Sequence, residues 1–176
     1  MEYLDIYDDE RNRTNKAIIR GEKLGPNDNL LAVFIVLFNN EGKMLIQKRS
    51  KDKSVAPGLW DFSAGGAVSS GESSYEGACR ETLEEIGFEI NKISKKPAFS
   101  QYYFKFIIDY YVVRTDWNID QFKLQKEEVD QLKYCDFDEI KTMMEKGEFR
   151  QHSLNVISLL FEINSQTGFG EEGNNL

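Results

Sequence analysis

The longest uninterrupted apolar segment of the chain runs from Leu30 to Phe38 and contains nine residues. A helix that crosses a membrane needs about 20 consecutive apolar residues, so this segment is too short to be one. A short apolar segment bounded by turn residues is typical of a buried strand. Turn residues follow at positions 39–42, and Met44–Ile46 is apolar again. This order predicts a hairpin in which the two apolar segments are neighbouring strands.

The length and composition predict one compact domain. The chain has 176 residues, of which 40% are hydrophobic. This is enough for a self-sufficient core, and it argues against wholesale disorder. The last segment is rich in Gly, Asn and Glu. We therefore expect a single domain over residues 1–163 and a flexible C-terminal tail over residues 164–176.

The charge balance disfavours two classes of partner. Lys and Arg number 22 and Asp and Glu number 30, which gives a net charge of −8 and a pI of about 4.8. We therefore expect no nucleic acid polymer and no membrane surface as partner. The acidic N-terminus lacks the positive start of a secretory signal, and Cys79 and Cys135 lack metal-binding spacing. Both features favour a cytoplasmic protein with reduced thiols.

A capping box predicts the position of the first long helix. Ser73 and Glu76 stand three residues apart, so each side chain can accept a hydrogen bond from the other residue's backbone N–H. Gly87 can adopt the positive φ that ends a helix. We therefore expect a helix over Ser74–Ile86.

The rest of the chain mixes strands and helices without a regular βαβ alternation, which indicates an α/β protein. Aromatic and β-branched residues favour one long strand over Tyr102–Val113, paired with Lys95–Ser100. The polar stretch that ends at Asn29 carries no clear pattern. The other predicted elements are strands over Leu4–Tyr7 and Gln131–Cys135, and helices from Asp136 to about Lys146 and over Gln151–Ile163.

The predicted helix region carries most of the acidity of the chain. Six carboxylates and one base lie between Gly65 and Ile90, a local charge of 1 − 6 = −5. At about 100° per residue, Glu81, Glu84 and Glu85 share one side of the helix. Like charges at this spacing repel. They need either open solvent or a counter-cation, and Mg²⁺ prefers such oxygen ligands. The residues expected on the opposite, packing side are Tyr75, Cys79, Thr82, Leu83 and Ile86.

The spacing of these residues resembles the Nudix box. Gly66 is followed after five residues by Glu72, and after seven more by Arg80, where the sequence Arg-Glu-Thr-Leu-Glu-Glu-Ile-Gly-Phe begins. All seven charged and glycine positions of the box match over 23 residues. The one departure is Thr82, where the family usually has an aliphatic residue. Its place on the packing side predicts an effect on packing rather than on metal binding.

The resemblance implies an α/β/α Nudix sandwich with a mixed β-sheet and a metal-dependent hydrolase. It implies that Glu81, Glu84 and Glu85 bind the metal, with the carbonyl of Gly66 as a further ligand. Glu84 and Glu85 are also expected to act in catalysis. The expected cofactor is Mg²⁺, with Mn²⁺ as the alternative. The residues with an implied structural role are Glu72, Arg80 and Gly87.

Beyond the box, the chain resembles the branch that contains isopentenyl-diphosphate isomerase. That isomerase has a Cys where this chain has Gly65, and a metal-binding His where it has Ala67. Without this thiol and this imidazole the chain lacks the groups that the isomerase mechanism uses. An isomerase-like hydrolase is therefore the better interpretation. The resemblance aligns Arg49 and Lys53 with diphosphate-binding positions, so we expect both to bind substrate. The segments that carry this match are Leu4–Asp8, Leu45–Ser50, Pro57–Trp60 and Phe62–Gly66.

A general base outside the box is common in Nudix hydrolases, often just before the last strand. Glu128 is the catalytic candidate here, and its neighbour Glu127 is the alternative. The lone histidine, His152, is interpreted as incidental, with a place in the lining of the site as the alternative.

Together these features predict hydrolysis of a diphosphate (pyrophosphate) linkage through attack of water on phosphorus. The default substrate is a nucleoside diphosphate derivative, a small molecule, and a homodimer is expected from the family alone. Two alternatives stay open. One is an isopentenyl-diphosphate isomerase-like enzyme, and the other is a non-catalytic, nucleotide-binding regulatory domain.

Overall fold

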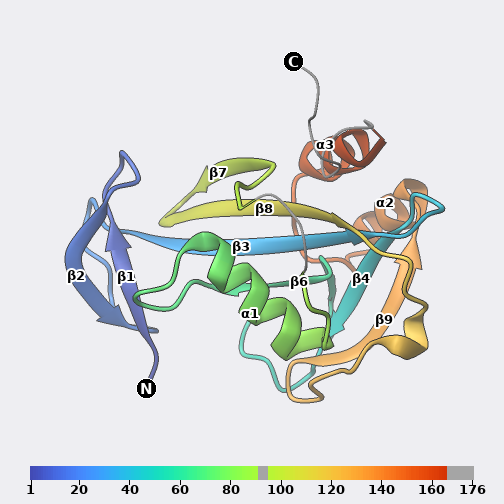
Figure 1. Cartoon of the computed structure of the whole chain (residues 1–176), viewed down its shortest axis with the longest axis horizontal. Helices are drawn as coiled ribbons and strands as arrows, with labels where there is room; N and C mark the ends of the chain where they lie inside the picture. The colour runs from blue at the N-terminus through green and yellow to red at the C-terminus, as the bar shows by residue number, and fades with distance from the viewer. Residues whose placement is uncertain (91–94, 166–176) are drawn as a thin grey trace.

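The computed structural model describes residues 1–90 and 95–165 and shows a mixed β-sheet with helices on both faces (Figure 1). No helix within these ranges is long and apolar enough to span a membrane. The strands are β1 Tyr3–Tyr7, β2 Arg13–Ile19, β3 Asn29–Phe38, β4 Met44–Arg49, β5 Trp60–Asp61, β6 Ala64–Ala67, β7 Phe99–Tyr103, β8 Phe106–Arg114 and β9 Val129–Cys135. The helices are α1 Ser74–Ile86, α2 Phe137–Glu145 and α3 Leu154–Ser165, with a short 3-10 helix, η1, at Ile119–Gln121.

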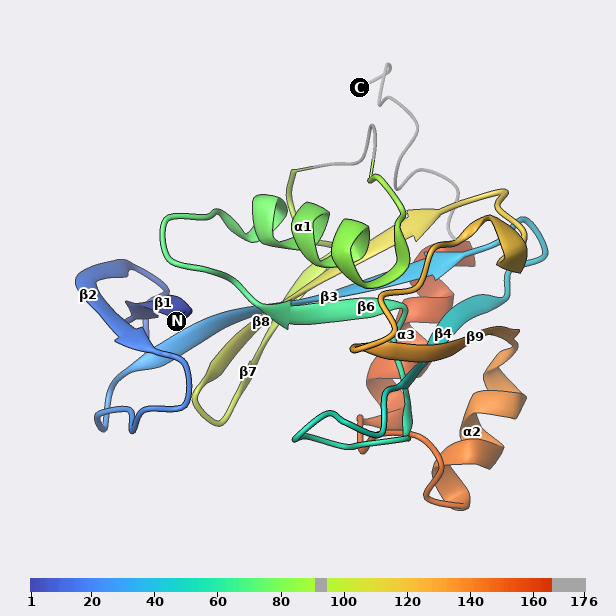
Figure 2. The same ribbon diagram turned by 90° about the horizontal axis from the view of Figure 1, so that it is seen from below.

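The apolar strand β3 is the centre of the sheet. It pairs in parallel with β8 along its length and antiparallel with β6. Its side chains alternate between two cores, so that Val33 and Ile35 pack with α1 while Phe34 and Val36 pack with α2 and α3. Figure 2 shows α1 on one side of β3 and the other two helices on the opposite side. Burial on both faces explains why this strand needs an uninterrupted apolar sequence.

The predicted hairpin between β3 and β4 is confirmed at its turn, but the pairing of the two strands ends after one residue pair. The two strands pair only at Phe38 and Met44, after which β4 pairs with β5 and β9 instead. Ser63 bridges the gap between them, because its Oγ accepts from the N–H of Leu37 at 2.8 Å and donates to the carbonyl of Leu45 at 2.5 Å. The sheet therefore splits at β3 and β4, and this gap is where the candidate site lies.

The predicted strand over Tyr102–Val113 is two strands rather than one. The chain turns at Phe104, which adopts a positive φ of 51°, and β7 then pairs antiparallel with β8. The predicted partner segment, Lys95–Ser100, contributes only its last two residues to β7. The aromatic composition favours strand on both sides of this turn, and no Gly or Asn marks the turn itself.

An N-terminal hairpin, which the sequence pattern predicted only in its first strand, extends the sheet beyond β3. Strand β1 pairs with β2 and with the start of β3. The loop between β1 and β2 carries Arg11, whose guanidinium binds the buried carboxylate of Asp109 on β8, with Nη1 to Oδ1 at 2.8 Å. Ser74 and Ser100 also donate to this carboxylate. One buried charge thus joins the hairpin, the sheet and the start of α1.

The three helices lie close to their predicted positions. Helix α1 has the predicted bounds, both halves of its capping box are formed, and Gly87 ends it with φ at 66°. Helix α3 begins at Leu154 rather than Gln151, because the N–H of Arg150 binds the carbonyl of Trp60 at 2.8 Å and keeps this segment extended beside β5. The first two residues of the predicted tail, 164 and 165, belong to α3, and residues 166–176 lie outside the described part of the chain.

Two glycines with positive φ allow a test of how closely the C-terminal end of α1 packs against the segment at Lys123. A Cβ on Gly87 would lie 2.8 Å from the Cβ of Lys123, whereas a Cβ on Gly42 would meet nothing within 4 Å. We expect Gly42→Ala to lower the free energy of unfolding by about 1–2 kcal/mol through backbone strain alone. Gly87→Ala adds a steric clash and should cost about 2–4 kcal/mol. Equal shifts of the urea midpoint in the two variants would contradict this packing.

Candidate active site

Glu85 is buried where α1 meets the split sheet. Its side chain is 4% exposed, and its Oε2 accepts two hydrogen bonds of 3.0 Å, from the N–H of Gly65 on β6 and from Nε2 of Gln47 on β4. The predicted division of α1 into a packing side and a carboxylate side is therefore wrong in part. Glu85 faces the sheet, whereas Leu83, expected to pack, is 49% exposed. The helical wheel assumed that α1 packs on one flat surface. The helix instead covers the junction between β4 and β6, and Glu85 points into this junction.

Burial makes the ionised form of Glu85 unfavourable. It raises the pKa of Glu85 from its ordinary value of 4.5 to about 7, and the nearby charge of Glu81 acts in the same direction. Burial also raises the pKa of Glu81, although Arg80 opposes this shift. A positive charge nearby would therefore stabilise the ionised forms of both carboxylates.

The carboxylate of Glu81 lies directly against the backbone of β6 at Gly66. A Cβ on Gly66 would stand only 2.3 Å from Oε1 of Glu81, so any larger residue would displace this carboxylate. The glycine at this position therefore permits the close approach of a carboxylate to the chain. This contact makes Glu81 and Gly66, two residues predicted to hold the metal, direct neighbours.

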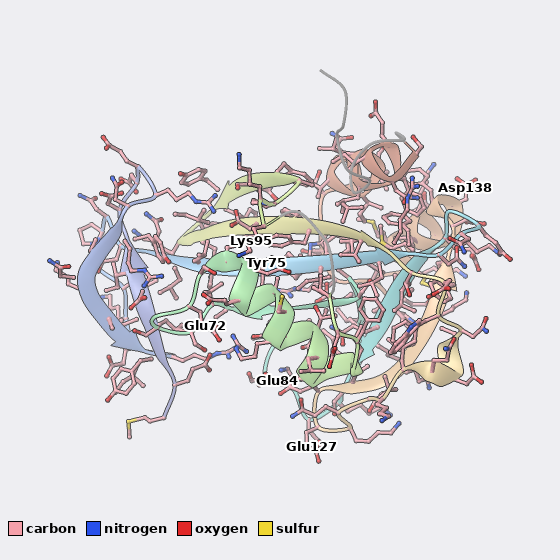
Figure 3. The ribbon with its side chains drawn as sticks, in the orientation of Figure 1. Glu72, Tyr75, Glu84, Lys95, Glu127 and Asp138 are labelled. Atoms are coloured by element: carbon pink, nitrogen blue, oxygen red, sulfur yellow. The ribbon has the colours of Figure 1, made fainter. Side chains whose placement is uncertain are left out.

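Arg80 holds three carboxylates at once. Its Nε and Nη2 bind the two oxygens of Glu72 at 2.8 and 3.0 Å, and its Nη1 contacts Glu81 at 2.8 Å and Glu84 at 3.2 Å. Nη2 also donates to the carbonyl of Ala67 at 3.1 Å. Hydrogen bonding to Glu72 raises the pKa of Arg80 further above its usual range. Figure 3 shows Glu72 beside the start of α1 and Glu84 near its end.

The predicted metal ligands are neighbours, but they do not converge on one point. Among residues 1–90 and 95–165, no three His, Cys, Asp or Glu side chains are grouped as a metal site. Glu81 and Glu84 bind Arg80, while Glu85 binds the sheet. The chemistry of these donors nevertheless fits a hard divalent cation, which prefers carboxylate and carbonyl oxygens. Glu81 also lies against the backbone of Gly66.

The structure brings together two residues that the sequence analysis assigned to different roles. Nζ of Lys53, a predicted substrate-binding group, forms an ion pair with Oε2 of Glu128, the predicted general base. The loops that carry them are joined by a hydrogen bond of 2.9 Å from the N–H of Ser50 to the carbonyl of Glu128. Burial and the charge of Arg49 lower the pKa of Lys53. The alternative base, Glu127, is exposed and points away from the fold (Figure 3).

A buried cluster around Asp61 was missed by the sequence analysis. Arg49 is 7% exposed, and its Nη1 lies 3.5 Å from Oδ2 of Asp61, which Arg150 also contacts at 3.0 Å. Nε2 of His152 lies 2.7 Å from Oδ1. Burial opposes ionisation of Asp61, but His152 and Arg150 hold its pKa below the usual value. The sequence does show a charged residue, Asp61, between two aromatic residues, which is a signal for a buried charge. Its partners Arg150 and His152 are 89 and 91 residues away, so the sequence does not identify them.

Comparison with known proteins gives the family. The family model of the NUDIX domain matches residues 28–157. An uncharacterized Nudix hydrolase of Listeria monocytogenes is 38% identical over 149 residues, which cover 85% of this chain and 88% of the relative. Another from Listeria innocua is 35% identical over 167 residues, which cover 95% of this chain and 98% of the relative.

A solved structure has the same fold. A crystal structure of a Deinococcus radiodurans protein matches 92% of this chain and 98% of its own, with a TM-score of 0.75 and 24% identity. The chain described here belongs to the Nudix hydrolase family. It is thus an enzyme of the class that acts on acid anhydrides, and members of this family generally hydrolyse pyrophosphate linkages in small molecules with divalent metal ions.

The raised pKa of Glu85 predicts how stability depends on pH without divalent cations. In the unfolded chain Glu85 loses its proton near pH 4.5, whereas in the folded protein it keeps the proton until about pH 7. The free energy of unfolding should therefore fall by up to about 3 kcal/mol as the pH rises through this window. Urea unfolding in EDTA at pH 4.5 and pH 8 measures this change. Glu85→Gln should lose much of it, and Glu84→Gln, on the exposed part of the helix, should retain it. Identical pH dependence in wild type and Glu85→Gln would refute the prediction.

Proposed function

We propose that this enzyme hydrolyses the diphosphate linkage of a nucleoside diphosphate derivative with the help of Mg²⁺, or alternatively Mn²⁺. The observation that carries the proposal is the buried carboxylate of Glu85, held by β4 and β6 at the split in the sheet. Glu81 lies beside it against Gly66. A buried and a half-buried carboxylate beside the backbone of β6 suit a cation and its phosphate ligand.

The proposed ligands of the cation are Glu81, Glu84 and Glu85, with the carbonyl of Gly66. When bound, the cation supplies positive charge that stabilises the developing charge on phosphate oxygens and lowers the pKa of water. The chain itself holds these groups in place. The N–H of Gly65 fixes one oxygen of Glu85. The exposed side chain of Glu84 is free to turn away from Arg80, because its ion pair is open to solvent.

Glu72 and Arg80 have a structural role in this proposal. Their two parallel hydrogen bonds fasten the loop after β6 to α1, and the N–H of Ser69 adds a third bond to Glu72 at 3.0 Å. Arg80 also donates to the carbonyl of Ala67, the last residue of β6. Bidentate pairs of this kind fix direction as well as distance. The pair thereby holds Gly66 against Glu81.

Glu128, Lys53 and Arg49 are proposed to act on the substrate side. Glu128 would accept the proton of the attacking water, and Lys53 would bind phosphate oxygens. Their ion pair is about one-quarter exposed, so a phosphate can replace Glu128 as the partner of Lys53 and leave the carboxylate unpaired. Arg49 is held by Asp61 and by the carbonyl of Val55, which fixes its guanidinium before substrate binds.

The isomerase alternative finds little support in the surroundings of Gly65. A Cβ at this position would lie 2.6 Å from a ring carbon of Phe34 and 2.6 Å from the carbonyl oxygen of Val33. A cysteine, as the isomerase has here, would therefore force the central strand to move. His152, the one histidine of the chain, binds Asp61. These observations favour hydrolysis over isomerisation.

The first experiment is a substrate panel with wild type and Glu85→Gln. It contains nucleoside di- and triphosphates, nucleotide sugars, dinucleotides and isoprenoid diphosphates, each with Mg²⁺ and with Mn²⁺. We expect wild type to release phosphate or nucleotide from a nucleoside diphosphate derivative. Glu85→Gln should lower kcat by at least about 100-fold, because one ligand and its charge are lost, with an unchanged circular dichroism spectrum.

Two outcomes would contradict the proposal. Equal turnover and metal dependence in Glu85→Gln would exclude the metal assignment. Metal binding without cleavage of any compound would favour the regulatory-domain alternative, and interconversion of isopentenyl and dimethylallyl diphosphates would restore the isomerase alternative.

The choice between Glu128 and Glu127 as general base gives a separate prediction. Glu128→Gln should lower kcat by about 100-fold or more, because the proton acceptor is lost. Glu127→Gln is the matched control, since Glu127 is exposed and adjacent in sequence, and it should stay within about twofold of wild type. Steady-state kinetics on the substrate found in the panel would decide, and equal effects of the two variants would exclude Glu128 as the base.

A further inference from the structure

Gln47 is the polar residue that holds Glu85 from the sheet side. It lies on β4, between β5 and β9, opposite Asp61 and Leu132. Its side chain is 2% exposed, and Nε2 donates to Oε2 of Glu85 at 3.0 Å. No role could be predicted for Gln47 from the sequence, because a single glutamine in a strand carries no motif of its own.

The other half of this amide has no partner. Among the residues that the structure describes, Oε1 of Gln47 is the one fully buried side-chain oxygen or nitrogen without a hydrogen bond. An unsatisfied buried carbonyl costs about 1–3 kcal/mol, and buried polar groups are almost always paired. An apolar residue of similar size, such as Met, would avoid this cost. The carbonyl therefore calls for an explanation other than packing.

The hydrogen bonds of Glu85 are also one-sided. Gln47 and the N–H of Gly65 both donate to Oε2, and no residue within 1–90 or 95–165 donates to Oε1 of Glu85. Two donors on one oxygen fix the plane of the carboxylate and leave the second oxygen as its available ligand atom. Partners of this kind orient metal ligands in proteins and are usually needed for full affinity.

We propose that Gln47 is a positioning residue for the active site, an inference that rests on the proposed function of Glu85. Its Nε2 turns Oε2 of Glu85 toward the sheet, so that the other oxygen faces the cation. Its Oε1 accepts a hydrogen bond from a water molecule that enters with the cation, which satisfies the buried carbonyl. Gln47 touches neither substrate nor reacting atoms directly, and it acts through Glu85.

A positioning role and a structural role predict opposite effects of Gln47→Met. This variant loses the bond to Glu85, but it also removes the unsatisfied carbonyl, so without metal its unfolding midpoint should stay close to that of wild type. Its affinity for Mn²⁺ should fall by about 10- to 100-fold. The value of kcat should fall with it, whereas KM for the substrate should change little. Gln131→Met makes the same replacement at an exposed position on the adjacent strand β9 and should behave as wild type.

The test is titration of wild type, Gln47→Met, Gln131→Met and Glu85→Gln with Mn²⁺ alone, followed by electron paramagnetic resonance of the free ion. Thermal unfolding of each protein in EDTA runs in parallel, and Gln47→Leu serves as the second variant if Gln47→Met fails to fold. Weaker Mn²⁺ binding with an unchanged unfolding midpoint is the expected result. Unchanged Mn²⁺ affinity would overturn the inference, and so would a fall in the midpoint that accompanies the loss of affinity. If Glu85→Gln itself binds Mn²⁺ as wild type does, the proposed metal site fails and this inference fails with it.

Discussion

The burial of one carboxylate organises the active region of this protein. Glu85 lies at the point where α1, β4 and β6 meet, and each of the two strands donates one hydrogen bond to it. A buried charge without such donors would cost several kcal/mol or lose its ionised form. These two bonds therefore fix how the Glu85 carboxylate is oriented between the helix and the sheet.

The split in the sheet creates the space that this carboxylate occupies. Strand β3 pairs with β6 and β8, and β4 pairs with β5 and β9, so the two strands separate directly after their shared turn. Near the turn, the side chain of Ser63 hydrogen-bonds to both strands. Further from the turn, the side chains of Glu85 and Gln47 occupy the space between them. Polar side chains thus replace the backbone ladder over this gap. The fold needs polar groups here to satisfy the backbone groups of the separated strands, and the proposed site uses these same polar groups.

The parts of this structure that depend on neighbours in sequence could be predicted, and those that depend on distant contacts could not. The bounds of α1 follow from Ser73, Glu76 and Gly87, which all act within one turn of the helix ends. The turn at Phe104 has no local signal. The pairing of Lys53 with Glu128 and the contacts of Arg150 and His152 with Asp61 join residues 75 to 91 positions apart. The box spacing predicts a role for Glu81, Glu84 and Glu85, but only the fold shows that Glu85 is buried against the sheet.

Arg80 gives the unloaded site an internal counterion. Its guanidinium already neutralises Glu81 and Glu84, besides the Glu72 that anchors it. In the proposed function, a divalent cation would therefore replace Arg80 as the positive partner of Glu81 and Glu84. The contacts to Arg80 would be given up in this exchange, which would weaken the net affinity for the ion. The arginine that braces the loop would thereby also favour release of the ion after turnover.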